Sequence, residues 1–233
     1  MKRKTKLSGV LRTAILVTMC GPVAAPLLPA ASAAPAVEIQ GFGASYGEWA
    51  ARWWQWILSI PAAVNPNLDA TGANCAQGQY DTVWFLGGAF GGTASRTCTV
   101  PVGKPIFFPL INTVIVAPKG SETLLDLRRQ AKAFIDTVTS LTCQLDGAAC
   151  APNLLDHRAT SPSFTVLAPN ARDALLPPGS LQRPGNSDSL VADGYWILLP
   201  PLSPGSHTLN FGATTSSGFG VNITYHLTVP FPE

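Results

Sequence analysis

Apolar and polar side chains alternate strictly near the C-terminal end of the chain. The apolar set is Val221, Ile223, Tyr225, Leu227 and Val229, and the polar set between them is Asn222, Thr224, His226 and Thr228. A period of two residues is typical of a β-strand with one buried face, so we predict a strand over 221–229. Shorter apolar runs bounded by turn residues predict further strands over 37–42, 81–86, 97–100, 105–116, 141–145, 163–167, 195–199 and 207–211.

Two segments follow the period of a helix instead. Ser45 and Glu48 form an S-x-x-E capping box, which predicts a helix over 46–60 that ends before Pro61. Its polar arc is narrow, which is typical of a helix enclosed in the core. A second amphipathic helix is predicted over 121–140. The buried stripes are Tyr46, Trp49, Trp53, Trp56, Ile57 and Ile60 in the first helix, and Leu124, Leu127, Ala131, Phe134, Ile135 and Val138 in the second.

The composition favours sheets over a helical bundle. Only 12% of the residues are charged, and glycine and proline number 21 each, which is typical of many short strands joined by tight turns. We therefore predict an α+β, mainly β fold: an antiparallel β-sandwich with two packed helices, at about 46–60 and 121–140. Residues 169–194 are rich in proline and glycine, so we expect a long irregular loop there.

The N-terminal segment has the pattern of a secretory signal peptide. Basic residues precede an apolar stretch over 13–28, and Ala31-Ser32-Ala33 is a small-x-small cleavage site. Glycine and prolines interrupt the apolar stretch, so it does not predict a membrane anchor. We predict a signal peptide over 1–33 and one globular domain over 34–233, secreted or periplasmic.

Cleavage removes five of the 15 Lys and Arg residues and none of the 13 Asp and Glu residues, so the net charge falls from +2 to −3 (10 minus 13). Such a chain has no electrostatic basis for binding nucleic acid or anionic lipid.

Four cysteines remain after cleavage, and an even number in an oxidising compartment predicts two disulfides. Of the three pairings we favour Cys75–Cys98 with Cys143–Cys150, because the turn dipeptide Asp146-Gly147 would bring the second pair together. The chain has no C-x₂-C pair and no histidine at ligand spacing. We therefore predict neither a metal site nor a cofactor.

Two resemblances to known proteins concern different parts of the chain. The segment 201–229, with its Pro204-Gly205 turn and its final alternation, resembles the closing strand pair of an immunoglobulin-like sandwich. The whole chain resembles exported bacterial proteins of no assigned role, through the tryptophan-rich stretches 53–56 and 193–196. The second resemblance implies export and no particular chemistry.

The sharpest candidate for catalysis is the G-x-S-x-G motif around Ser45, which matches a hydrolase nucleophile elbow. A predicted strand and helix flank it as the elbow requires, but only about ten residues of the mature chain precede it, too few for the βα units of such hydrolases. Capping the helix is a sufficient alternative role for the hydroxyl. A nucleophile would need one of the three histidines, His157, His207 or His226, as its base. We pair Ser45 with His157, which lies between Asp156 and Arg158 in a predicted loop.

Two segments are candidates for binding. Residues 65–71 place oxygen ligands at alternate positions, but they lack the glycine and the final acidic residue of a calcium loop, so we prefer an Asx-turn loop. Indole rings stack on sugars when they are exposed, and Trp54, at the margin of the apolar stripe, is the candidate for exposure. With Arg52 and Glu48 on the polar arc, it forms the candidate ligand-binding set.

These observations favour a non-enzymatic role. No coherent catalytic set emerges, so we expect a secreted β-sandwich that binds an extracytoplasmic ligand, and a polysaccharide is the ligand class we consider. The alternative is a secreted hydrolase that uses Ser45.

Overall fold

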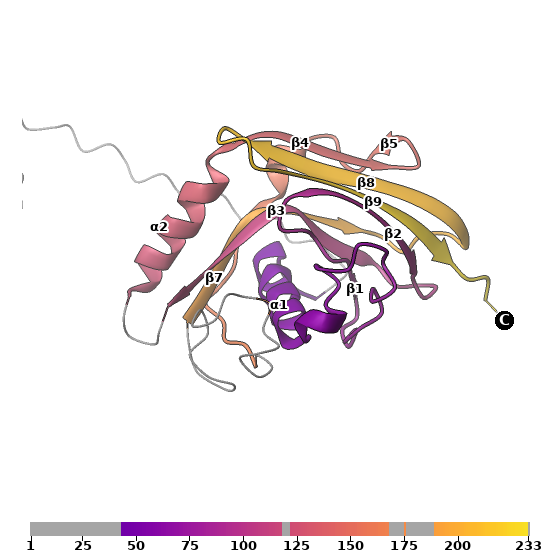
Figure 1. The fold of residues 1–233 in the computed structure, drawn as a ribbon, viewed down its shortest axis with the longest axis horizontal. Coiled ribbons are helices and arrows are strands. Elements are labelled where there is room, and N and C mark those ends of the chain that lie inside the picture. Colours follow the sequence, from indigo (N-terminus) through magenta and orange to yellow (C-terminus); the bar gives the residue numbers. More distant parts are fainter. Residues whose placement is uncertain (1–42, 118–121, 168–174, 176–188, 233) are drawn as a thin grey trace, which may run out of the picture. The chain divides into compact units, whose positions relative to one another are not determined.

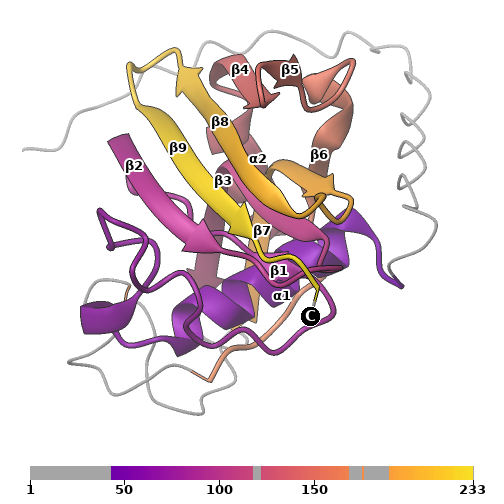
Figure 2. The same ribbon diagram turned by 90° about the vertical axis from the view of Figure 1, so that its right-hand side faces the viewer.

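The computed structural model describes residues 43–117, 122–167, 175 and 189–232. This part of the chain forms two packed β-sheets and two α-helices, so the expected α+β, mainly β sandwich is confirmed (Figure 1). The four-stranded sheet has the order β1-β3-β7-β6, with β1 at Trp84–Phe85, β3 at Ile106–Ala117, β7 at Ser189–Leu199 and β6 at Arg158–Thr160. The five-stranded sheet has the order β2-β9-β8-β4-β5 (Figure 2), with β2 at Gly92–Thr99, β9 at Gly220–Val229, β8 at Gly205–Thr215, β4 at Val138–Leu145 and β5 at Ala148–Ala149.

Most neighbouring strands are antiparallel, including the long β3–β7 and β8–β9 pairs. Two pairs, β1–β3 and β2–β9, are parallel. Hydrophobic alternation does not distinguish strand direction, so these two pairings differ from the purely antiparallel sandwich that we expected. The loop after the first helix covers part of the outer edge of β2, where Thr97 N donates to Thr71 O at 2.8 Å.

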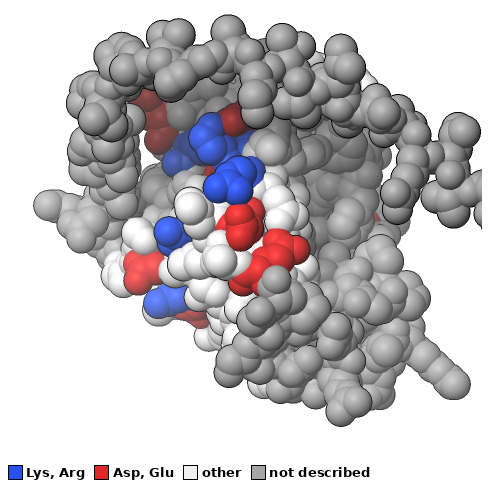
Figure 3. Space-filling view, turned by 90° about the vertical axis from the view of Figure 1, so that its left-hand side faces the viewer, with Lys and Arg blue, Asp and Glu red and all other residues white. Residues whose placement is uncertain are grey.

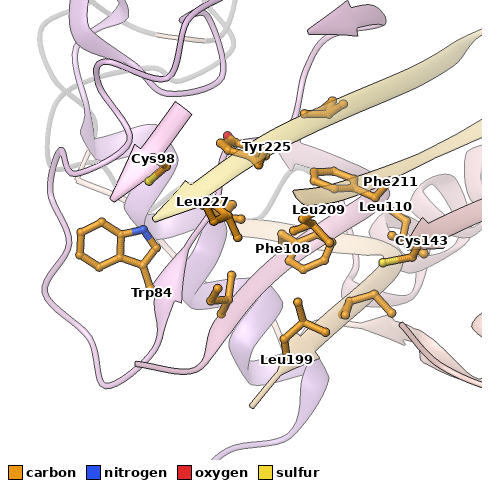
Figure 4. Packing of buried hydrophobic residues seen from close by; sticks show 14 of the residues in the cluster. Trp84, Cys98, Phe108, Leu110, Cys143, Leu199, Leu209, Phe211, Tyr225 and Leu227 are labelled. Atoms are coloured by element: carbon orange, nitrogen blue, oxygen red, sulfur yellow. The ribbon is translucent and has the colours of Figure 1, made fainter. Parts of the chain in front are cut away.

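The four-stranded sheet is buried on both faces. Phe108 and Ile197 belong to the core between the sheets, where the Phe108 ring lies 4.6 Å from that of Phe211 (Figure 4). On the other face, Phe107 and Trp196 stack at 5.4 Å beneath helix α1 (Tyr46–Ser59). The fold therefore has three layers: α1, the four-stranded sheet and the five-stranded sheet (Figure 1).

Helix α1 has the predicted start and the predicted buried face. The Ser45 side chain accepts from Glu48 N at 3.3 Å, and the Glu48 carboxylate accepts from Ser45 N at 2.8 Å, so the capping box is confirmed. Trp49, Trp53 and Trp56 are at most 1% exposed. Gly47 permits close packing against β6, because a Cβ at this position would lie 2.5 Å from Thr160 O.

The second helix is shorter than predicted. Helix α2 covers Leu124–Ile135, where the sequence predicted a helix over 121–140. Val138 belongs to β4 rather than to the buried stripe, because the helix ends at Ile135 and β-branched residues follow its capping residue Asp136. Leu124, also expected to be buried, is 41% exposed.

Several strand boundaries also differ from the predictions. The segment 163–167 makes only an isolated bridge between Phe164 and Leu190, and β7 begins at Ser189 rather than at 195. Residues 189–194 are therefore not part of an irregular loop. The predicted strand over 37–42 and the predicted signal peptide over 1–33 lie outside the described residues.

Both predicted disulfides are present. Cys75–Cys98 joins the loop after α1 to β2, and Cys143–Cys150 closes the β4–β5 hairpin. Asp146 and Gly147 adopt φ values of 52° and 82°, the left-handed conformation that a tight two-residue turn requires. In the part of the chain that the structure describes, no helix is long and apolar enough to span a membrane.

A histidine–aspartate pair fixes this turn to β8. His207 Nδ1 lies 2.7 Å from Asp146 Oδ2, and Thr208 N donates to Asp146 Oδ1 at 2.7 Å. The hydrogen bond to Asp146 raises the pKa of His207 and lowers that of Asp146. Since the pKa of the folded-state histidine is raised, its contribution to stability is complete below the ordinary value of about 6.5 and is lost as the pH rises through the folded-state value.

We expect the replacement Trp196→Ala to lower the free energy of unfolding by about 3–5 kcal/mol, because it opens a cavity between α1 and the four-stranded sheet, where the Trp196 ring packs against Trp53 and Phe107. Urea denaturation measures this change. Phe90→Ala is the matched control, since Phe90 is 54% exposed and should change stability little. Equal effects of the two replacements would contradict the burial of the sheet on both faces.

We expect His207→Ala to destabilise the protein more at pH 5.5 than at pH 9, because protonated His207 is the form that Asp146 stabilises. Thermal unfolding at both pH values measures the difference. Asp146→Asn keeps a side chain that tolerates a left-handed backbone but removes the negative charge, so it should abolish the pH dependence of the His207→Ala effect. A pH-independent effect in the wild-type background would show that the pair does not stabilise through charge.

Candidate functional surface

The structure places the predicted catalytic pair at the same end of α1 but joins each residue to a different partner. Ser45 Oγ donates to Glu48 Oε2 at 2.8 Å, within the capping box. His157 ends the short helix η2 (Leu154–His157), and its Nδ1 lies 2.9 Å from the Tyr46 hydroxyl. Burial lowers the pKa of His157 and raises that of Tyr46 to about 12, so both are neutral at pH 7. Among the described residues, no hydrogen bond connects Ser45 to a histidine, and capping accounts for its contacts.

The predicted ligand-binding set does not present an exposed aromatic ring. Trp54 is 4% exposed and meets the Trp53 ring edge-on at 5.1 Å, so the expected exposure of Trp54 is wrong. Arg52 lies 4.5 Å over the ring of Trp49 and 3.6 Å from Asp81, and Glu48 belongs to the capping box. Trp54 is buried because other segments of the chain enclose α1. One of them contains Phe164, which belongs to the same buried cluster as Trp54.

The loop over 65–71 uses its oxygen atoms internally. Asp69 Oδ1 accepts from Thr71 N at 2.8 Å and Asp69 Oδ2 from Asn74 N at 2.7 Å. The Asn65 amide donates to Ile57 O at the end of α1, at 2.7 Å. The Asx-turn interpretation is confirmed, and among the described residues no group of His, Cys, Asp or Glu could hold a metal ion.

Sequence reasoning missed a broad surface, the outer face of the five-stranded sheet. Every inward position of β9 is buried, and the residues between them point to the opposite face, so the pairing of β2, β9, β8 and β4 aligns their outward positions in rows. One row, for example, contains Thr97, His226 and Thr208. We call this surface the hydroxyl face; its members are Thr93, Ser95, Thr97, Thr99, Asn222, Thr224, His226, Thr228, Ser206, Thr208, Asn210, Thr214, Ser140, Thr142 and Gln144.

No member of the hydroxyl face carries a permanent charge or a large apolar side chain. The one Lys, Arg, Asp or Glu residue in the five strands is Arg96, which points inward and is 2% exposed. Charged side chains gather elsewhere, and Figure 3 shows both signs mixed on the side where α2 lies. The hydroxyl face is therefore polar but uncharged, whereas charged side chains lie on other parts of the surface.

The hydroxyl face is partly ordered by its own hydrogen bonds. The Asn210 amide donates to Thr224 Oγ1 at 2.9 Å and to Asn222 Oδ1 at 3.1 Å, across the β8–β9 pair. By contrast, the Thr93, Thr99 and Thr228 hydroxyls make no hydrogen bond to another described residue. Within a row, side chains on adjacent strands are about 4.8 Å apart, and successive rows are about 6.7 Å apart along the strands, so the donors and acceptors form a regular array.

Comparison with known proteins adds no assignment. No protein-family model, no curated protein and no solved structure matches the chain. The immunoglobulin-like resemblance of the C-terminal strands therefore stays a prediction, although the β8–β9 pair itself is present.

We expect Ser45→Ala to lower the free energy of unfolding by about 1 kcal/mol, the usual effect of losing a helix cap. Ser45→Thr is the control, because threonine retains the capping hydroxyl and should change stability less. A serine-directed fluorophosphonate should label neither the wild-type protein nor the variants. Labelling of the wild type that Ser45→Ala abolishes would instead identify Ser45 as a nucleophile.

Proposed function

We propose that the protein is an extracytoplasmic binding domain whose hydroxyl face binds a neutral polysaccharide. The observation that carries this proposal is the composition of the face: fifteen polar side chains on four strands, with no Lys, Arg, Asp or Glu among them. The expected export of the chain and its two disulfides are consistent with a ligand outside the cytoplasm.

Chemical complementarity supports a polyhydroxylated ligand. A sugar hydroxyl both donates and accepts hydrogen bonds, and so does each serine or threonine hydroxyl on this face. No charge has to lose its water shell without an opposite charge to replace it, which is the main cost at a charged surface. An array that extends over several strands suits an extended chain better than a single small molecule.

The side chains of the face also lose little entropy on binding. Threonine is branched at Cβ and populates few rotamers, and the pleated sheet restricts it further. Ordering Lys, Arg or Glu costs up to about 2 kcal/mol each, and short hydroxyl side chains cost less. The face is therefore preorganised, and preorganisation preserves affinity when each single contact is weak.

Two other classes of partner fit the face less well. Protein interfaces are enriched at their centre in aromatic residues, Met and Arg, and the hydroxyl face contains none of them. Nucleic acids require Lys and Arg to neutralise phosphates, and these are also missing from the face. No contact favours the alternative hydrolase, because the Ser45 hydroxyl is engaged with Glu48.

We expect the mature protein to bind at least one neutral polysaccharide in a panel of cellulose, chitin, xylan, mannan and an α-glucan, measured by pull-down and by affinity electrophoresis. The triple variant Thr93→Val, Thr97→Val, Thr99→Val should bind at least tenfold more weakly. It keeps the shape and strand preference of β2 but removes three hydroxyls, each worth about 0.5–1.5 kcal/mol in a hydrogen bond.

Thr160→Val, on the exposed end of β6, is the matched control and should bind like the wild type. Thr97→Glu should also weaken binding, because the new carboxylate must lose water without gaining a partner. Binding that is confined to charged polysaccharides, that the triple variant retains in full, or that is lacking across the panel would refute the proposal.

A further inference from the structure

β3 has a strand on both of its edges only over its first residues. On one edge it pairs with β7 from Ile106 to Ala117, whereas on the other edge β1 pairs only with Ile106 and Phe107. Among the described residues, no further strand is hydrogen-bonded to β3. The pairing ends at Pro109, because proline has no N–H group to continue the ladder. Beyond Pro109 this edge of β3 is therefore open in the part of the chain that the structure describes.

The register with β7 identifies the backbone groups that lie on the open edge. Leu190 exchanges two backbone hydrogen bonds with Phe164, so the even-numbered residues of β7 direct their backbone groups away from β3 and the odd-numbered residues bond to it. The pairs of residues that bond to each other are Val191 with Ile115, Asp193 with Thr113 and Tyr195 with Ile111. The residues between them on β3 are Asn112, Val114 and Val116, and their N–H and C=O groups therefore point to the open edge.

A cavity of about 210 Å³ lies along this edge, and residues 109–114 of β3 line it. Its other lining residues come from both sides of the four-stranded sheet. Trp53 and Trp54 belong to the cluster beneath α1, whereas Val221 and Ile223 belong to the core between the two sheets. A cavity that touches side chains from both faces of a sheet must lie at an edge of that sheet. The open edge of β3 is thus recessed between two walls.

The walls of the cavity are apolar and partly open to solvent. Phe90 is 54% exposed, and the rings of Phe134 and Phe219 meet edge-on at 5.9 Å. No Lys, Arg, Asp or Glu is among the described residues of the lining. A dry cavity of about 150 Å³ holds benzene, so this one has room for one large or two small apolar side chains.

The sequence of β3 does little to protect the open edge. Proteins usually protect an edge with charged side chains, with proline or a bulge, or with a covering loop. The loop after α1 covers the edge of β2 in this way at Thr97. After Pro109 and the irregularity beside it, residues 110–116 include no charged side chain and no second proline. They are rich in β-branched residues, so this segment is suited to accept another strand.

We infer that the open edge of β3 binds an extended, uncharged segment of a partner protein, which adds a strand to the four-stranded sheet. The N–H and C=O groups of Asn112, Val114 and Val116 recur about every 6.7 Å, and another strand carries complementary groups at the same repeat. Apolar side chains of the added strand fill the cavity between the walls. The partner is not a second copy of this chain, because the edge of β3 in each copy is recessed between walls of its own.

Amide hydrogen exchange tests the open edge directly. In the free mature protein, the amides of Asn112, Val114 and Val116 should exchange at least about tenfold faster than those of Thr113 and Ile115, which bond to β7. A bound strand should slow the exchange of the first three amides and leave the other two little changed. Slow exchange of all five amides in the free protein would overturn the inference, because the edge would then already be paired.

The binding probe is a capped heptapeptide that alternates valine with threonine, because both residues favour an extended chain and neither is charged. We expect calorimetry to show saturable binding of this peptide to the mature protein. Two N-methylated forms are its controls: methyl groups on the valine nitrogens block one edge of the peptide, and methyl groups on the threonine nitrogens block the other. Strand addition uses one edge, so one form should bind like the parent peptide and the other at least about tenfold more weakly.

Val114→Pro removes one N–H group from the open edge and keeps a side chain of similar size. It should weaken peptide binding at least about tenfold and leave the melting temperature close to that of the wild type, because β7 does not use this N–H group. Thr113→Pro is the matched control: it removes an N–H group that bonds to β7, so it should lower the melting temperature clearly.

Phe90→Ala is a second variant, which decides the question if Val114→Pro does not fold. It removes an exposed ring from the wall of the cavity and should weaken peptide binding. Phe231→Ala is its matched control, because Phe231 is 76% exposed and is not among the residues that line the cavity, so this variant should bind the peptide normally.

The binding experiments can also contradict the inference. A lack of saturable peptide binding, equal binding of the two N-methylated forms, or full binding by folded Val114→Pro or Phe90→Ala would overturn it. Protection of the edge amides that appears only as the protein concentration rises would overturn it in favour of a second copy. Neither Val114 nor Phe90 belongs to the hydroxyl face, so both variants should bind polysaccharide like the wild type. Failure of the polysaccharide proposal and failure of this inference are therefore separate outcomes.

Discussion

The fold depends on a four-stranded sheet that has no solvent-facing side over most of its length. β3 and β7 form its centre, and both of their faces must be covered, one by α1 and the other by the five-stranded sheet. These two strands bury one charged side chain, Asp193, which is 1% exposed and pairs with Arg158 at 2.7 Å. Arg158 also bonds Asp136 at the end of α2, so the buried carboxylate is compensated by a residue that fixes the helix to the sheet.

β2 has a different role on each of its two faces. Its outward residues contribute threonine and serine to the hydroxyl face, and its inward Arg96 donates to Gly88 O and Asn67 O, which fixes two neighbouring loops. Arg96 is an uncommon core residue, because its guanidinium is held by carbonyl oxygens and by Tyr225 with no carboxylate paired to it among the described residues. Burying a cation in this way costs desolvation energy. In return, Arg96 holds the loop after β1, which contains Gly87 and Gly88, in one position.

Local patterns predicted the elements whose sequence follows one period. The capping box and tryptophan spacing predicted α1, and the strict alternation predicted β9. The first half of β2 was missed because its inward Arg96 interrupts the apolar pattern. Helix α2 was predicted too long because Val138 continues the helical phase, although its β-branched side chain suits the strand that it occupies.

The sites were harder to predict than the elements, for a physical reason. Threonine and serine occur in strands and loops alike, so no local pattern marks the hydroxyl face, which exists only because β2 pairs with β9 from the far end of the chain. The same holds for Trp54: the helical period places it near the polar arc, but the enclosing segments bury it.

The hydroxyl face consists of side chains that do little for the stability of the isolated protein. Exposed hydroxyls on a sheet contribute less than packed or charge-paired residues. A chain selected only for stability has no need for four strands without an exposed charge. Since such features persist when a ligand compensates for them, the least stabilising parts of this structure are the best guide to its function.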